Sequence, residues 1–369
     1  MAPRPTDRVL DDLVNNRGRG APLRKKLAAT PDRNWLLALV LHSCAKSAEG
    51  AQLTDLEQAI VSAFRKNGVT DEQIRQHGGA DQRMPRQLRD ELFPKRFAQL
   101  DVKQSYSLRD LAKDAPAIVQ SVLSMPTVTQ LDVPAIHAGT ASLSDFPLPS
   151  RALLREHATA MTVAVDPEAA VPRTAAPPEA RISIKATSFR CIDRQTDSIF
   201  DPSNEPYWIF GSLGSGVTVT TRSQIFGDVD GGETRNFTST DGCVWGQNCA
   251  AQPLPDTEIG SLVSLWEHDE GNAEDIRKGV AAAFAAAAGV LAASGVAAWI
   301  GAVTAGVGAV VVWLLGFLDD DHIADQTFVF NRAVVAKQLP NVGSSFNVTR
   351  RFTDGDGDYE LTLRVARAT

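Results

Sequence analysis

The feature that most constrains this chain is a run of forty residues, 279–318, without a single charged side chain. Lys278 precedes the run and Asp319 follows it directly. One bilayer-spanning helix needs roughly 20 apolar residues, so the run is long enough for two helices. Ser294 and Gly295 lie at its midpoint and are typical of a turn. The sequence therefore predicts an apolar helical hairpin, which we assign to residues 275–318.

The two arms of this hairpin differ in hydrophobicity. The first arm is mostly Ala, whereas the second is rich in Val, Leu, Ile and Trp. Small residues allow helices to approach closely in a bilayer, and Trp is enriched at membrane interfaces. The hairpin either contacts a membrane or is buried permanently in a folded core, and the sequence leaves both alternatives open. The residues expected to insert in the first case are Trp299, Ile300, Val311, Trp313, Leu314 and Leu315.

The distribution of charge argues against a nucleic-acid partner. The chain holds 37 Lys and Arg against 44 Asp and Glu, and the acidic excess lies in its second half. A nucleic-acid-binding domain usually carries a strongly basic face. The first 16 residues lack the apolar core of a secretory signal. The location is unknown from the sequence, and export would need a non-classical route, such as a secretion or delivery machine.

Composition divides the chain into three parts. Residues 1–125 carry helix-start signals, among them Thr54 with Glu57 and Ser107 with Asp110 at capping-box spacing. Residues 126–180 are rich in Pro and Ala, as linkers are. Residues 181–369 contain about seven alternating segments separated by turns, which is typical of a β-sandwich. We therefore predict an α+β multidomain chain, with an N-terminal helical domain and a C-terminal antiparallel β-sandwich that carries the inserted hairpin.

Acidic residues recur at the ends of the predicted strands. Ca²⁺ takes 6–8 oxygen ligands in flexible geometry, so acidic loops at one end of a sandwich would suit it. Asp and Glu also favour exposed turns without binding a metal, and both interpretations remain open. Residues 354–358, an alternating Asp and Gly run, have the same two interpretations.

Three segments resemble the loops of C2 domains and occur in the same order. They are NEPYWIF at 204–210, LWEHDEG at 265–271 and DDDHIADQTFVF at 319–330. C2 domains are β-sandwiches that bind Ca²⁺, and often phospholipid, through these loops. Glu stands at positions 205 and 267, where the family usually has Asp, and the hairpin is inserted where a metal-binding loop is expected. The resemblance implies a lipid membrane as partner and Ca²⁺ ligands at Asp193, Glu205, Glu267, Asp269 and Asp321.

The hairpin by itself is similar to the central hairpin of colicin-type pore-forming domains. Only its uncharged composition of Ala, Gly, Val and Leu supports this likeness. The resemblance implies a hairpin that is buried in solution and enters a bilayer later, in an effector or toxin.

Known catalytic motifs are lacking in the sequence. GSLGSG at 211–216 has no Lys after it, as a phosphate loop would require, and neither GxSxG nor HExxH occurs. Cys243 and Cys249 form either a small disulfide loop or two free thiols. The predicted function is a non-enzymatic protein that associates with membranes through a Ca²⁺-dependent C2-like domain and the hairpin. The alternative is a soluble structural or binding module with the hairpin as core.

Overall fold

The chain forms two compact units in the computed structural model. The helical unit comprises Met1–Met125 and Glu270–Asp320, and the sheet unit comprises Pro126–Asp269 and Asp321–Thr369. Each unit is described by itself below. The structure describes residues 5–18, 20–132, 135, 140, 148–165, 180–194, 204–214, 217–255, 258–268, 273–294, 300–316, 320–355 and 357–368.

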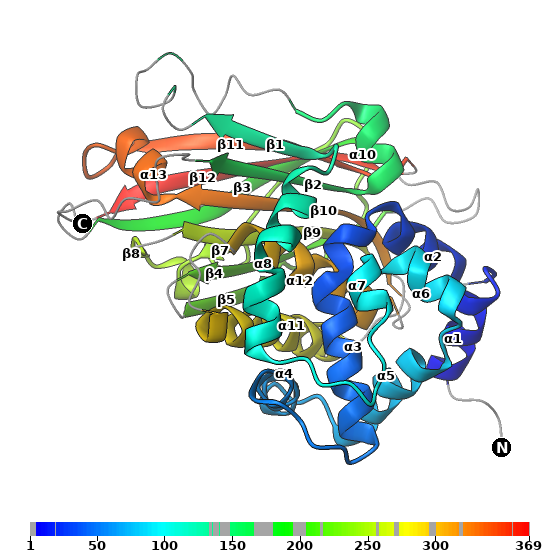
Figure 1. Cartoon of the computed structure of the whole chain (residues 1–369). Helices are drawn as coiled ribbons and strands as arrows, with labels where there is room; N and C mark the ends of the chain where they lie inside the picture. The colour runs from blue at the N-terminus through cyan, green and yellow to red at the C-terminus, as the bar shows by residue number, and fades with distance from the viewer. Residues whose placement is uncertain are drawn as a thin grey trace. The chain divides into compact units, whose positions relative to one another are not determined.

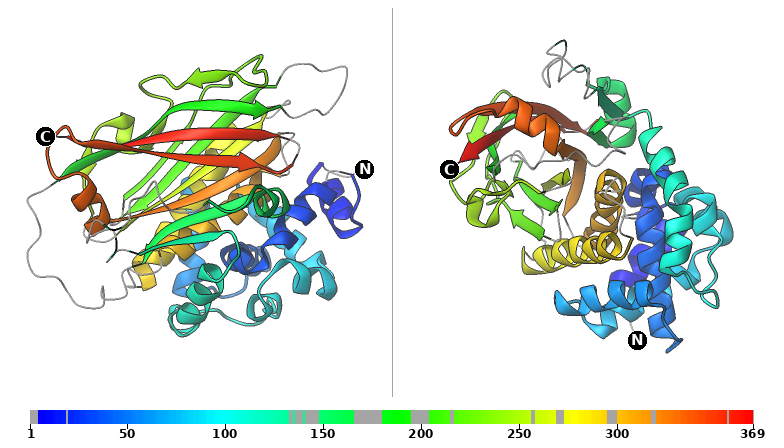
Figure 2. Two further views of the ribbon diagram at one scale, coloured as in Figure 1. Left: turned by 90° about the horizontal axis from the view of Figure 1, so that it is seen from above. Right: turned by 60° about the vertical axis from the view of Figure 1, so that its left-hand side comes forward.

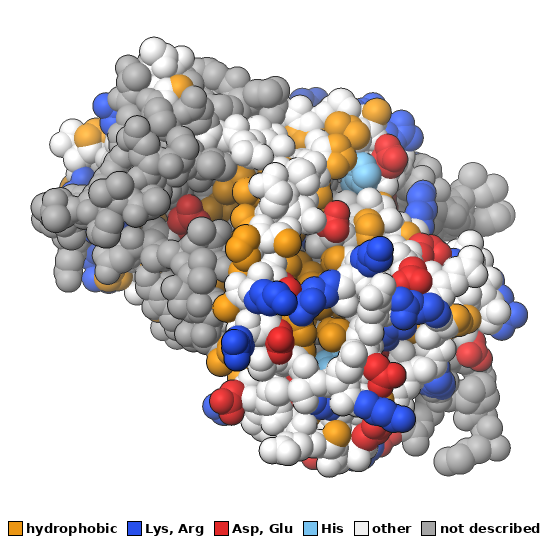
Figure 3. Space-filling view, viewed as in Figure 1, with side chains coloured by type: hydrophobic (Ala, Val, Ile, Leu, Met, Phe, Trp, Pro, Cys, Tyr) orange, Lys and Arg blue, Asp and Glu red, His pale blue; other side chains and the backbone are white. Residues whose placement is uncertain are grey.

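The helical unit contains short helices from the N-terminal part and the two long arms of the hairpin (Figure 1). On the face seen in Figure 3, Lys and Arg side chains are interspersed with Asp and Glu over this unit. Its elements are α1 (Pro5–Val14), α2 (Gly20–Ala29), η1 (Pro31–Asn34), α3 (Trp35–Ala48), α4 (Asp55–Lys66), α5 (Asp71–Arg83), α6 (Arg86–Leu92), α7 (Lys95–Ala98), α8 (Leu108–Leu123), α11 (Ala273–Ser294) and α12 (Ile300–Leu315).

Capping boxes fix the starts of three helices in this unit. Thr54 begins α4, Thr70 begins α5 and Ser107 begins α8, each accepting a hydrogen bond from the backbone amide three residues on. A capping box satisfies two amides that the helix cannot satisfy itself. The two boxes expected from the sequence, at Thr54 and Ser107, are both present.

In its described residues, the sheet unit is built from two sheets, the α-helices α10 and α13 and the short 3-10 helix η2. Its elements are β1 (Val128–Asp132), α10 (Arg151–His157), β2 (Thr159–Val165), β3 (Arg181–Asp193), β4 (Pro206–Gly214), β5 (Val217–Arg222), β6 (Thr234–Asn236), β7 (Cys243–Trp245), η2 (Gln247–Cys249), β8 (Gln252–Pro253), β9 (Glu258–Glu267), β10 (Asp321–Asn331), α13 (Arg332–Gln338), β11 (Ser345–Thr353) and β12 (Asp358–Ala368).

The two sheets enclose one apolar core and so form a sandwich (Figure 2). One sheet has the order β1-β2-β10-β9-β4-β5, and the other has the order β11-β12-β3-β6 with β7 and β8 also paired to β3. Trp208 from the first sheet meets Phe352 from the second edge to face, with ring centroids 4.8 Å apart. Alternation of side chains along each strand places such residues on the inner faces.

The structure confirms the α+β class and modifies its details. The first sheet is mixed rather than purely antiparallel, because β2 runs parallel to both β1 and β10. The range expected as a linker, 126–180, contributes β1, α10 and β2. The strands on either side of the hairpin pair directly, since Asp321 at the start of β10 is opposite Glu267 at the end of β9. The hairpin thus leaves and rejoins the sheet unit at adjacent strands while its helices belong to the helical unit.

Candidate functional site

The second arm of the hairpin is a buried, uncharged helix. Fifteen of the sixteen residues of α12 are buried, and within the helical unit it packs on α11, α3, α8 and η1. The first arm, α11, packs chiefly on α4 and α12 and is less completely covered. Ala281, Ala285 and Ala288, on one face of α11, are only half-buried. The apolar hairpin is therefore held along its second arm more closely than along its first.

Small residues bring α12 close to its neighbours. A Cβ atom added at Gly306 would lie 2.9 Å from Leu36 Cβ and 3.2 Å from Trp35 Nε1 of α3. Between the arms, a Cβ atom at Gly279 would lie 3.2 Å from a Leu315 methyl carbon. Real Cβ atoms do not approach other carbons to 2.9 Å, so the packing of α3 on α12 requires glycine at position 306.

Polar side chains also anchor α12. Arg33 Nε donates to the carbonyl of Ala305 at 2.8 Å, and Trp35 Nε1 donates to the carbonyl of Ala302 at 3.3 Å. Near the other end, Trp313 Nε1 donates to Nδ1 of His77 on α5 at 3.4 Å. These contacts compensate donors that would otherwise be buried without a partner. They fix the position of α12 along its axis, which apolar packing alone does not do.

The residues expected to insert into a membrane differ in how far the protein buries them. Ile300, Val311, Trp313 and Leu315 are buried, and Leu314 is half-buried. Trp299 lies outside the described residues. Among the helices that the structure describes, none combines the length and apolar character needed to cross a bilayer.

The expected Ca²⁺ ligands are only partly brought together. The backbone N–H of Glu205 donates to Oε1 of Glu267, and Asp321 is the cross-strand neighbour of Glu267. Asp193 is exposed at the end of β3, where it pairs with Asp358 of β12, in a different sheet from β9 and β10. Asp269 lies outside the described residues. Within the described part of the chain, no group of three or more His, Cys, Asp or Glu residues is arranged to hold a metal ion.

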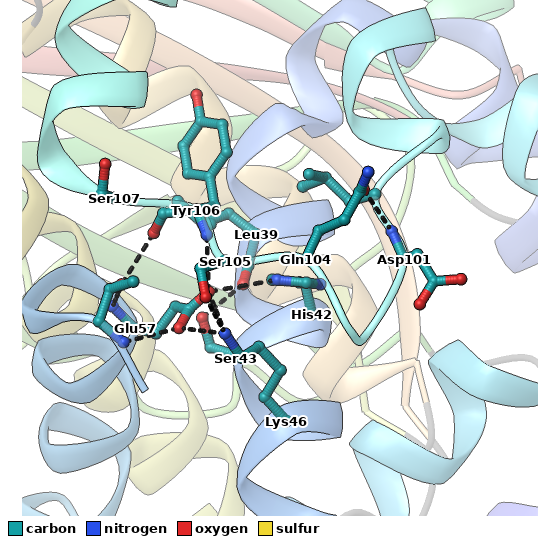
Figure 4. Close-up of polar contacts among 12 residues, drawn as sticks. Leu39, His42, Ser43, Lys46, Glu57, Asp101, Gln104, Ser105, Tyr106 and Ser107 are labelled. Carbon is teal, nitrogen blue, oxygen red and sulfur yellow. Dashed lines mark hydrogen bonds and ion pairs between the residues drawn. The ribbon is translucent and has the colours of Figure 1, made fainter. Parts of the chain in front are cut away.

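A buried charge cluster, formed by Glu57, Lys46 and His42, is a feature that the sequence did not predict (Figure 4). Lys46 Nζ lies 2.9 Å from Glu57 Oε2, and both side chains are buried. His42 Nε2 lies 3.2 Å from Glu57 Oε1, although neither ring nitrogen makes a hydrogen bond of good geometry. The backbone amides of Thr54 and Tyr106 donate to the same carboxylate at 2.8 and 2.9 Å. One carboxylate thereby ties together α3, the start of α4 and the segment before α8.

The electrostatics of this charge cluster favour a structural role. Burial by itself raises the pKa of Glu57, but contacts with His42, the two amides and Lys46 outweigh it and lower that pKa to about 2. Lys46 Nζ also lies 3.0 Å from Ser105 Oγ, which is a further contact between α3 and the segment before α8. The capping-box spacing predicted that Glu57 bonds Thr54, and gave no sign of its long-range partners.

Of the two alternatives for Cys243 and Cys249, the structure contains the disulfide. Cys243 and Cys249 form a disulfide, with Cα atoms 4.9 Å apart. Cys44 and Cys191 are free thiols, and both are buried. The disulfide closes a short loop beside β7 in the sheet unit.

Comparisons with known proteins do not assign the chain to a family. No family model matches the sequence, and no curated protein matches it. Two solved structures of human GIVD cytosolic phospholipase A2, one with methyl gamma-linolenyl fluorophosphonate and one with that inhibitor and terbium chloride, are similar at a TM-score of 0.23 and 10% identity. Each match covers 53% of this chain and 18% of the phospholipase chain. At that level the likeness carries no argument about fold or function.

Proposed function

We propose that this chain is a membrane-associating protein that stores its apolar hairpin in the helical unit and releases it into lipid. The observation that carries the proposal is the hairpin itself, with no charge between residues 279 and 318 and with α12 buried over its length. Exposing such a surface to water is costly, since each Å² of apolar area costs roughly 25 cal/mol. Lipid is a second environment in which that surface is stable.

The half-buried face of α11 supports a starting point for this release. Ala281, Ala285 and Ala288 bury little apolar area because their side chains are single methyl groups. The first arm therefore contributes less to its own retention than α12 does. We expect α11 to separate first and α12 to supply most of the free energy of transfer into lipid.

A C2-like, Ca²⁺-dependent contact of the sheet unit with lipid is a further part of this proposal. Its support is the sequence resemblance, together with the backbone closeness of Glu205, Glu267 and Asp321 at neighbouring strand ends, although the described residues form no metal-holding group there. Carboxylates brought together repel one another unless a cation or a proton intervenes. Bound Ca²⁺ should then raise the thermal midpoint of the protein by mass action. Equal thermal midpoints in millimolar Ca²⁺ and in chelator would contradict the role of calcium. The proposed release of the hairpin into lipid would not be affected.

Liposome flotation and dye release test the hairpin directly, with charge introduced on its half-buried face. Ala285→Glu places a carboxylate at a tolerant site, and Ala285→Gln is the matched neutral control. A charge at a helix centre costs about 2.5–3.5 kcal/mol on insertion. We expect Ala285→Glu to reduce dye release roughly a hundredfold, while Ala285→Gln stays close to wild type. Val311→Asp should also abolish release, but Val311 is fully buried and this change threatens folding as well.

A second candidate function is a soluble structural or binding module in which the hairpin is permanent core. The polar anchors Arg33 and Trp35 on the carbonyls of α12 favour it, since they specify one packed position. On this alternative wild type neither floats with liposomes nor releases dye at any lipid composition, pH or Ca²⁺ concentration. Dye release that is lost in Ala285→Glu and retained in Ala285→Gln would contradict it.

A further inference from the structure

The contact between Trp313 and His77 is the polar anchor of α12 that depends on a protonation state. The indole Nε1 of Trp313 is a donor only. It donates to Nδ1 of His77 at 3.4 Å, so that nitrogen must be unprotonated. A protonated imidazole carries N–H groups at both ring nitrogens. Its Nδ1–H would then face the indole N–H of Trp313, and two donors cannot form a hydrogen bond. The packed position of α12 is thus compatible with neutral His77 and not with the imidazolium form.

The surroundings of His77 make the imidazolium still less favourable. His77 is nine-tenths or more buried on α5, and α12 offers it no charged side chain. Burial lowers the pKa of His77 to about 4, from an ordinary value of 6.5. A proton that binds to His77 must therefore disrupt this packing to regain hydration.

Other titratable groups lie on α5 and on the elements that contact it. Asp81, one turn further along α5, forms an ion pair with Arg89 of α6. Burial raises the pKa of Asp81, and Arg89 opposes that shift. The elements that contact α5 also carry titratable groups, among them Cys44, His42 and Lys46 on α3, Glu57 and Arg65 on α4 and Asp12 on α1.

We propose that protonation of His77 releases α12 from its packed position, so that acid is the signal that frees the hairpin. This inference rests on the proposed function, because release matters only if the hairpin acts outside the helical unit. The direction of the effect follows from linkage. The open state binds a proton more readily than the packed state, so the packed state loses stability as pH falls from about 6.5 towards 4. Below the lower value both states are protonated and the loss stops increasing.

Hydrogen exchange of residues 300–315 in the full chain, without lipid, measures this opening. After correction for intrinsic exchange rates, the opening constant of wild type should rise roughly fiftyfold between pH 7 and pH 4.5. Glu57 contributes little in that range, because its pKa is about 2 in the folded unit and it stays ionised there. A flat profile in wild type would overturn the inference whatever any variant does.

Two substitutions identify the group responsible. His77→Gln keeps a neutral side chain with an acceptor oxygen, and its opening constant should not change with pH. Trp313→Phe removes the donor, so α12 should already be looser at pH 7 and the rise should be smaller. His157→Gln, on α10 of the sheet unit, is the control and should behave as wild type. A full rise in His77→Gln, or in Trp313→Phe, would show that this contact is not the sensor.

The same samples separate this inference from the proposed function. Lipid entry that is independent of pH, together with a flat exchange profile, would overturn the acid signal and leave membrane entry standing. Acid-dependent opening without any lipid entry would retain the His77 sensor and overturn the membrane function.

Discussion

At the residue scale, Glu57 is a buried carboxylate whose contacts join three parts of the helical unit. Glu57→Gln leaves the ammonium of Lys46 buried without an anion. Breaking a buried ion pair by removing one partner costs about 3–5 kcal/mol. We expect a loss of that size in the urea unfolding transition of the helical unit. The control is Asp71→Asn, because Asp71 pairs with Arg65 at the surface and such pairs contribute about 1 kcal/mol or less. Equal losses in the two variants would show that the charge cluster is not specially important.

The ionisation of Glu57 also makes the stability of the helical unit depend on pH. Its pKa is lowered on folding, so its stabilisation is complete above about 4.5 and is lost as pH falls towards 2. Most of that pH range lies below the range from about 6.5 to 4 in which His77 gains its proton. As pH falls, the contact between His77 and Trp313 is therefore weakened before the charge cluster around Glu57 is.

At the element scale, the closeness of α3 and α12 depends on one glycine. Gly306→Ala forces a methyl group against Leu36 and Trp35, and overpacking of this kind costs about 1–3 kcal/mol. Gly289→Ala, on α11, is the matched control, since its Cβ would meet Ala59 Cβ at an ordinary 3.7 Å. Both changes gain the same helix propensity, about 1 kcal/mol. Thermal unfolding should therefore separate the two variants by the overpacking cost, and similar midpoints would contradict the packing described here.

The elements also show how far the sequence predicts the fold. The longer strands after residue 180 were predicted by their alternation, whereas the short strands β6, β7 and β8 were not, and the helix starts at Thr54 and Ser107 were predicted by their capping spacing. β1 and β2 were missed, because they are short parallel strands within a Pro-rich range whose partner β10 is distant in the chain. The position of the hairpin and the partners of Glu57 depend on contacts between residues far apart in sequence. Local periodicity and capping signals do not encode such contacts.

At the scale of the whole molecule, an insertion between two paired strands places the hairpin in another compact unit. β9 and β10 are neighbours in one sheet, yet the residues between them form α11 and α12 of the helical unit. The β9–β10 pairing does not itself include any residue of α11 or α12. We therefore expect the sheet unit to stay folded when the hairpin moves.

The central claim is that the hairpin moves from the helical unit into lipid, and an environment-sensitive dye at position 285 tests it most directly. Ala285→Cys can be labelled selectively, because Cys44 and Cys191 are buried and Cys243 is bonded to Cys249. The control is a label at the exposed Val342 of the sheet unit, introduced as Val342→Cys. With liposomes at pH 4.5, we predict that the emission of the dye at position 285 shifts to the blue and is quenched by lipid-borne quenchers, while the control keeps its aqueous emission. Unchanged emission at position 285 across lipid compositions, pH and Ca²⁺, in a chain that remains folded, would contradict the account.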